Sequence, residues 1–487
     1  MILHPKFYEI LKNLNIIRIF LNIIRIVGIQ KKMNREMSKS QQNSSGGGGG
    51  TLLDHLNDKD WTQKNFVVEF QTPKQDIDIN TNNIKFSMDP SRPSVNLIDR
   101  KLYKTLISVK NIIGEIKADN KLYLWNKWVK LINPYEKISS FSTRVNEPIS
   151  RAFFKLHEIL TFFEYPIDPS GVSLHLCEAP GGFIRCVEEL YPSMDWYGHT
   201  LYEGGGSLTI NKSLLVNPKK WILLNHPKYE KSGNLYIPKT IFNIKKIIGV
   251  KVDLITADGG FDVSCDPNNQ EQLSLQLILC EIVTALICQK AGGVFICKIF
   301  DTFTKPTCQL IYLLMKYYEK VSIIKPRSSR FSNSEKYLVC SNFKEIKESD
   351  VTILMALCIN WKKNKKTYCR DLGIVLSEEF ENTIINYNKF LANNQIWYIN
   401  FILKNYSISK DMISQFEVLQ NKRALEYCKY FNLCDNKSNG KFHCNHSKVR
   451  KVSISTYNMS NIVRCANCLT LFYYTNNCVY DSKILQI

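Results

Sequence analysis

The chain has 487 residues, of which 44% are hydrophobic and 11% aromatic, and this content excludes an intrinsically disordered protein. Lysine and arginine number 64 against 44 aspartate and glutamate, which gives a formal net charge of +20. This excess favours a phosphate-bearing partner such as a nucleic acid, although membrane-surface proteins can be equally basic. The 16 scattered cysteines argue against a disulfide framework and favour a reducing compartment, the cytoplasm or the nucleus.

Residues 1–50 are predicted to lie outside the folded part. Residues 1–35 hold seven lysines and arginines and one acid, Glu9, among isoleucines and leucines. A mitochondrial presequence or a membrane-surface helix has a similar composition, but the charges interrupt every apolar stretch, so no stable membrane span is expected. We favour a dispensable basic extension. Residues 38–50, SKSQQNSSGGGGG, are typical of a flexible linker.

The rest of the chain divides into three regions. Residues 51–146 form an accessory region with helical stretches such as 101–132. Residues 147–345 alternate between strand and helix patterns: GVSLHLC, VDLITA and GGVFICKIF are predicted strands, and 270–291 is a predicted buried helix. Residues 346–487 form a mostly helical, cysteine-containing accessory region. This order predicts an α/β fold with a doubly wound, Rossmann-like sheet and mostly helical flanks.

A glycine pair follows the first of these strands. The segment 178–183, EAPGGF, turns from the strand into a helix, and adjacent glycines allow the backbone to approach a ligand closely. Doubly wound sheets bind nucleotides at this carboxyl edge. The segment is not the G-x-G-x-x-G fingerprint, and the chain has no G-x-x-x-x-G-K-[ST] phosphate loop.

Two charged residues end two other strands. Asp258 follows one and Lys298 ends the next, so we expect both at the same edge of the sheet. Apolar surroundings make a lysine less basic, which would suit a general base, while a nearby carboxylate opposes that change. The pair could equally be a structural ion pair.

Five segments, taken together, resemble the ordered motifs of FtsJ/RrmJ-type ribose 2′-O-methyltransferases. They are SRAFFKLHEIL at 150–160, LCEAPGGF at 176–183, ITADGGFD at 255–262, FICKIF at 295–300 and KPRSSRFSNSEKYLVC at 325–340. The resemblance implies S-adenosylmethionine as methyl donor, chemistry without a metal ion, and a tetrad around the target ribose. The tetrad corresponds to Lys155, Asp258, Lys298 and Glu335, with Lys298 as the base.

The same resemblance implies which residues contact the cofactor. They are Glu178, Ala179, Pro180, Gly181, Gly182, Phe183, Thr200, Asn234 and Asp258. Asn234 departs from the family pattern, because an acidic residue usually receives the adenine amino group. An asparagine carbonyl can still accept that hydrogen bond.

Within this family, the segments ADGGFD and NNQEQLSLQLILCEIVTAL are most similar to the mRNA cap 2′-O-methyltransferases of eukaryotes and large DNA viruses. A capped mRNA is therefore the expected substrate, with the first and second nucleotides both open. The capping or transcription machinery is an expected partner. If the source is a virus, the expected location is the host cytoplasm or the virion. Alternatives are a ribosomal RNA methyltransferase, which a mitochondrial location would favour, and a catalytically silent RNA-binding module.

Two further clusters suggest ligands. Lys325, Arg327 and Arg330 surround the Glu335 segment and are predicted RNA contacts. Near the end of the chain, a C-x-H and a C-x-x-C pattern provide four candidate ligands for a structural zinc ion, although their spacing matches no known finger and reduced free cysteines are the alternative. These ligands are Cys444, His446, Cys465 and Cys468.

Overall fold

The computed structural model describes most of the chain after residue 65. The described ranges are 66–73, 76–89, 97–118, 122–202, 209–224, 226–229, 231–260, 268–363, 368–404 and 410–434, together with the strands 449–451, 462–465 and 471–473. The predicted basic extension and linker, residues 1–50, lie outside these ranges.

A seven-stranded sheet forms the core, with the strand order β1-β7-β8-β6-β5-β3-β4. β4, β3, β5 and β6 pair in parallel, while β8, β7 and β1 join by antiparallel pairs. The strands are β1 Val67–Phe70, β3 Val172–Leu176, β4 Asp195–Gly198, β5 Val252–Ala257, β6 Gln289–Ile299, β7 Tyr318–Ile324 and β8 Lys336–Phe343. The predicted doubly wound α/β fold is confirmed.

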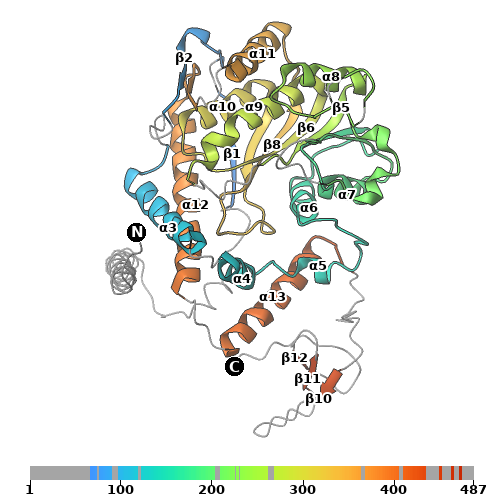
Figure 1. The fold of residues 1–487 in the computed structure, drawn as a ribbon, viewed down its shortest axis with the longest axis vertical. Helices are drawn as coiled ribbons and strands as arrows, with labels where there is room; N and C mark the ends of the chain where they lie inside the picture. The colour runs from blue at the N-terminus through green and yellow to red at the C-terminus, as the bar shows by residue number, and fades with distance from the viewer. Residues whose placement is uncertain are drawn as a thin grey trace, which may run out of the picture. The chain divides into compact units, whose positions relative to one another are not determined.

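Helices cover both faces of the sheet. Figure 1 shows α8 (Pro238–Ile248), α9 (Gln270–Cys288) and α10 (Lys305–Tyr317) together on one face, and α6 (Ala152–Phe163) beside α7 (Gly182–Leu190). α9 is apolar on all sides because it is buried among the sheet, α8, α10 and α11 (Glu348–Lys363). In the described part of the chain, α9 alone is long and apolar enough to cross a membrane, yet 78% of its most apolar 18-residue stretch is buried inside the protein.

The sequence patterns located these elements with small errors at the ends. The helix predicted to reach residue 291 stops at Cys288, because Gln289 is already extended (φ −75°, ψ 143°) and begins β6. The three strands predicted from apolar runs correspond to β3, β5 and β6. These strands are covered on both faces of the sheet, so most of their side chains are apolar, and this made the strands recognisable in the sequence.

The flanking regions pack directly on the sheet rather than apart from it. β1 pairs with β7, and β2 (Ile84–Ser87) pairs with β9 (Tyr368–Leu372). The long helix α12 (Glu378–Lys404) lies against α3 (Arg100–Ala118). The remaining α-helices and strands of the described residues are α4 Leu122–Ile132, α5 Ile138–Phe141, α13 Lys410–Tyr430 and the small sheet β10 Val449–Lys451, β11 Ile462–Cys465 and β12 Leu471–Tyr473. Phe70 and Leu97 of the first flanking region, and Leu354 and Ile384 of the second, therefore belong to the same hydrophobic core as the sheet.

Glycine is required at positions 181 and 182 for two different structural reasons. Gly181 has a φ of +117°, which L-residues rarely adopt, and a Cβ there would lie 2.1 Å from Leu214 Cδ1. Gly182 faces the start of α6, where a Cβ would lie 2.3 Å from Ser150 Oγ and 3.1 Å from Phe153 N. Helix packing, rather than approach to a ligand, therefore requires glycine at position 182.

We predict that Gly182→Ala lowers the free energy of unfolding by about 1–3 kcal/mol, because the added methyl group overpacks the contact between α6 and α7. The matched control is Gly114→Ala in α3, where nothing lies within 4 Å of an added Cβ. That variant should gain about 0.5–1 kcal/mol from helix propensity. Thermal and urea unfolding followed by circular dichroism measure both. Equal stability of the two variants would contradict the packing argument.

Candidate active site

Glu178 holds the turn between β3 and α7. Its buried Oε1 accepts hydrogen bonds from the backbone N–H groups of Phe183 (2.7 Å) and Ile184 (3.1 Å), so it caps the first turn of α7. Its other oxygen, Oε2, is buried and has no hydrogen-bond partner among the described residues. Burial and the nearby Asp258 raise the pKa of Glu178 well above its ordinary value.

The four predicted tetrad residues come together at the carboxyl edge of the sheet. The Nζ of Lys298, at the end of β6, lies 2.7 Å from the backbone oxygen of Asp258 and 3.2 Å from its Oδ1. The Nζ of Lys155, on α6, lies 2.8 and 2.9 Å from the two carboxylate oxygens of Glu335. The site thus consists of two neighbouring ion pairs, and each takes its residues from distant parts of the sequence.

The charge balance differs from the sequence-based prediction. Burial lowers the pKa of Lys298, but the carboxylates of Asp258 and Glu335 raise it by more, so the pKa lies above its ordinary value. The prediction that the surroundings make Lys298 less basic is therefore wrong for this structure. Burial likewise raises the pKa of Glu335, but Lys155 and Lys298 outweigh it and bring the pKa to about 2.

Tyr337 is a site residue that the sequence analysis missed. It lies on β8 opposite Lys298, and its hydroxyl donates a 2.9 Å hydrogen bond to Asp258 Oδ1. It lies two residues after Glu335, and side chains two apart in an extended segment share a face. That spacing was the available signal. Tyr337 orients the carboxylate that holds Lys298.

Some of the predicted cofactor contacts are occupied by packing within the protein, and others form the turn between β3 and α7. The ring of Phe183 is fully buried and packs against that of Tyr337, and its N–H is already bonded to Glu178, so its prediction as a cofactor contact is not supported. Gly182 is likewise taken up by helix packing. Ala179, Pro180 and Gly181 form the turn itself, next to Glu178.

Thr200 and Asn234 lie on adjacent segments beyond β4. The backbone N–H of Tyr202 donates to the carbonyl of Ser232 (2.8 Å), which joins the two segments. Asn234 Oδ1 already accepts a 2.9 Å hydrogen bond from the N–H of Tyr236. An adenine amino group would have to use the second lone pair of that oxygen.

The predicted RNA contacts separate into buried and accessible groups. Lys325 is only 4% exposed and its ammonium group is surrounded by oxygens of its own loop, so it cannot reach a phosphate, and its prediction as an RNA contact is wrong. Arg330 is 30% exposed and pairs with Glu136 (2.7 Å). The guanidinium of Arg327 lies 5.9 Å from the ring centre of Tyr430, an exposed aromatic residue.

No group of three or more histidine, cysteine, aspartate or glutamate side chains within the described ranges could hold a metal ion. Of the four proposed zinc ligands, only the backbone of Cys465, in β11, is described. The side chains of Cys444, His446, Cys465 and Cys468 lie outside the described residues, so the zinc site stays a prediction.

The carboxyl edge of this Rossmann-like sheet has a glycine turn, the acidic residues Glu178 and Asp258, and two ion pairs between a lysine and a carboxylate. Such an arrangement is typical of enzymes that bind a nucleotide cofactor. Residues 148–343 match the family model of the FtsJ-like methyltransferases. The central part of this chain is an FtsJ-like methyltransferase domain, as its motifs implied.

Three similar proteins carry the name of cap-specific mRNA 2′-O-methyltransferases, one of them as an inactive form. The chain is 31% identical over 293 residues to the cap-specific mRNA (nucleoside-2′-O-)-methyltransferase 2 of Danio rerio, covering 55% of this chain and 39% of that protein. It is 37% identical over 169 residues to the cap-specific mRNA (nucleoside-2′-O-)-methyltransferase of Autographa californica nuclear polyhedrosis virus, covering 35% of this chain and 63% of that protein. It is also 30% identical over 274 residues to a Caenorhabditis briggsae relative named as an inactive cap-specific methyltransferase 1B, covering 53% of this chain and 32% of that protein. The chain thus spans less than two thirds of each.

We predict that Asp258→Asn lowers the pKa of Lys298, because it removes the largest influence that raises this pKa. The pH dependence of Lys298 acetylation, resolved by peptide mass spectrometry, measures the change: the acetylation curve should move to lower pH. The matched control is Asp371→Asn, which breaks a remote ion pair with Lys305 and should leave the curve in place. An unmoved curve in Asp258→Asn would show that the Asp258 charge does not control Lys298.

Proposed function

We propose that this protein transfers a methyl group from S-adenosylmethionine to a ribose 2′-hydroxyl at the first or second nucleotide of capped mRNA. The observation that carries the proposal is the juxtaposition of Lys298–Asp258 with Lys155–Glu335 at the cofactor edge of an FtsJ-like domain. The names of the relatives support the capped substrate.

The residues present suit a cationic cofactor. Glu178 and Asp258 provide an acidic edge, and Glu178 Oε2 is buried without a partner, a state that an incoming donor or positive charge would relieve. When bound, S-adenosylmethionine supplies an activated methyl group on a positively charged sulfur. The candidate cofactor contacts in this proposal are Glu178, Ala179, Pro180, Gly181, Thr200, Asn234 and Asp258.

Lys298 would accept the proton of the 2′-hydroxyl. It must first lose its own proton to solvent, and any additional positive charge at this edge of the sheet would favour that loss, because like charges lower the pKa of an ammonium group. Asp258, oriented by Tyr337, holds the Lys298 Nζ in place. Lys155 would stabilise negative charge that develops on the ribose oxygen, and the carboxylate of Glu335 holds Lys155 in place.

The RNA backbone would lie near Arg330. Its side chain donates to Glu136 through Nε and Nη2, so that, among the described residues, its Nη1 donors are left for a phosphate. Arg151, one helical turn before Lys155, pairs with the same Glu136 (2.7 Å), so two guanidinium groups lie together beside the tetrad. A catalytically silent RNA-binding module, the alternative that the sequence left open, would keep these arginines without needing the tetrad, and one similar protein is named as inactive.

We predict that Lys298→Ala removes nearly all methyl transfer while cofactor affinity stays within a few-fold, because the base acts on the acceptor and not on the donor. Loss of a general base typically costs on the order of 10²-fold or more in turnover. Turnover with labelled cofactor and calorimetric cofactor binding measure the two effects. Retention of more than about a tenth of wild-type turnover would exclude Lys298 as the base.

We predict that labelled methyl groups are transferred to RNA with a 5′ cap and not to the same RNA with a free 5′ triphosphate. A third RNA, capped and already methylated at the first ribose, separates the two candidate positions: only a second-nucleotide enzyme labels it. Equal labelling of all three RNAs would contradict the capped substrate and favour the ribosomal RNA alternative. If none is labelled, the silent-module alternative gains support.

A further inference from the structure

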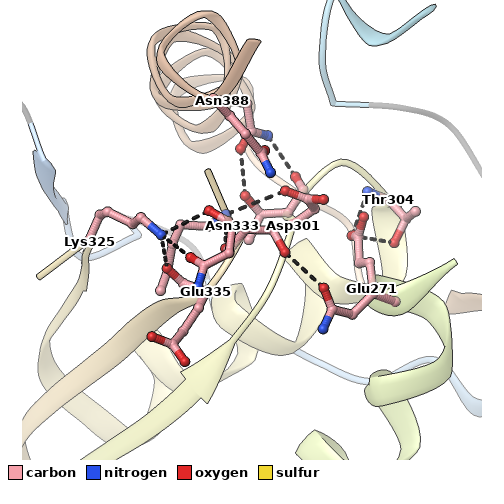
Figure 2. Close-up of polar contacts among 12 residues, drawn as sticks. Glu271, Asp301, Thr304, Lys325, Asn333, Glu335 and Asn388 are labelled. Carbon is pink, nitrogen blue, oxygen red and sulfur yellow. Dashed lines mark hydrogen bonds and ion pairs between the residues drawn. The ribbon is translucent and has the colours of Figure 1, made fainter. Parts of the chain in front are cut away.

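Lys325 lies inside the loop that it begins. It directly follows β7, and the loop 326–335 leads from it to Glu335 and then to β8. Although its side chain is long and charged, the residue is 4% exposed. In Figure 2 its ammonium nitrogen lies among oxygens of Asn333 and Glu335, away from Asp301.

Five oxygens of the loop lie within hydrogen-bond distance of the Lys325 Nζ. They are Ser329 Oγ at 3.2 Å, Arg330 O at 3.0 Å, Asn333 O at 2.9 Å, Asn333 Oδ1 at 2.6 Å and Glu335 O at 2.8 Å. Buried backbone carbonyls need a hydrogen-bond donor, and the Lys325 Nζ provides donors for those of this loop. The bonds reach from the middle of the loop to its last residue.

The last of these bonds fixes the backbone of Glu335, and a second route reaches its side chain. The hydroxyl of Ser329 lies beside the Lys325 Nζ and donates a 2.8 Å hydrogen bond to Glu335 Oε1. The same carboxylate holds Lys155 at 2.8 Å. A continuous chain of polar contacts therefore runs from Lys325 through Ser329 and Glu335 to Lys155.

The outer side of the loop is held separately. Glu158 accepts from the backbone N–H groups of Arg327 and Ser328 (2.7 and 3.1 Å), and Gln395 of α12 donates to Ser332 O (3.0 Å). These contacts hold Arg327, Ser328 and Ser332 against α6 and α12. Lys325 contacts the other positions, 329, 330, 333 and 335, from within the loop.

We propose that Lys325 is a positioning residue that fixes Glu335, and through it Lys155, without touching RNA or cofactor. This inference rests on the proposed methyl transfer, in which Lys155 acts beside the ribose. Displacing a catalytic group by about 1 Å can lower turnover on the order of 10²-fold. Loss of the Lys325 ammonium group should therefore lower turnover while leaving binding of the methyl donor intact.

The test compares Lys325→Met with Lys110→Met in the full chain. Both remove a buried ammonium group. Lys110 pairs with Asp301 at 2.8 Å and has no contact with the Glu335 carboxylate. For Lys325→Met we expect kcat to fall by about tenfold to a hundredfold, with cofactor affinity within a few-fold of wild type. Lys110→Met should keep kcat near that of the wild type at temperatures where it is folded.

A second readout separates positioning from stability and needs neither RNA nor cofactor. Acetylation of Lys155, followed by peptide mass spectrometry, should increase in Lys325→Met to the level seen in Glu335→Gln, because the carboxylate no longer holds the amine. In Lys110→Met it should stay at the wild-type level. Wild-type kcat or wild-type Lys155 acetylation in a folded Lys325→Met would overturn the proposal.

Ser329→Ala gives a milder test if Lys325→Met does not fold. It removes only the hydroxyl that joins Lys325 to Glu335 Oε1. We expect a several-fold lower kcat and higher Lys155 acetylation, and no change in either would contradict the relay. If wild-type protein methylates no RNA, the proposed function fails, whereas the Lys155 acetylation pattern still tests whether Lys325 positions Glu335.

Discussion

The ion pair between Lys298 and Asp258 depends on the parallel pairing of β5 and β6. That pairing brings the ends of two strands together and places an ammonium group 3.2 Å from a carboxylate in a largely dry environment. Separating such a pair would leave an uncompensated buried charge, which is strongly destabilising. The fold and the chemistry thus share one constraint: the strand ends that complete the core also hold the groups that would react.

A second layer of buried polar contacts joins the flanking regions to this edge. Asp301, just beyond β6, pairs with Lys110 of α3. Asn388 of α12 donates to the backbone oxygens of Thr302 (2.7 Å) and Leu97 (2.8 Å). In return, the hydroxyl of Thr302 donates to Oδ1 of Asn388 (2.5 Å). Glu271 accepts from the N–H and hydroxyl of Thr304, as Figure 2 shows. The segment 301–304, just after β6, is therefore held by Lys110, Glu271 and Asn388, which lie far apart in the sequence.

The sequence was informative where a local pattern determines the structure. Buried strands have continuous apolar runs, so β3, β5 and β6 could be identified, and their ends gave the positions of Asp258 and Lys298. It was uninformative where the outcome depends on distant partners. The pKa of Lys298 is set by Asp258 and Glu335 together, and Lys325 could not be distinguished from its basic neighbours Arg327 and Arg330. A lysine that carbonyls surround and an arginine that faces solvent have the same formal charge.

The short strand β1 protects one edge of the central sheet. Val67–Phe70 pairs along β7 and thereby covers the hydrogen-bonding groups at the end of the sheet. Without it, β7 would present a row of unpaired backbone donors and acceptors, flanked by buried apolar side chains, to any other extended chain. The region matched by the methyltransferase family, residues 148–343, does not include β1. The strand that covers this edge of the matched region therefore precedes the region by almost eighty positions.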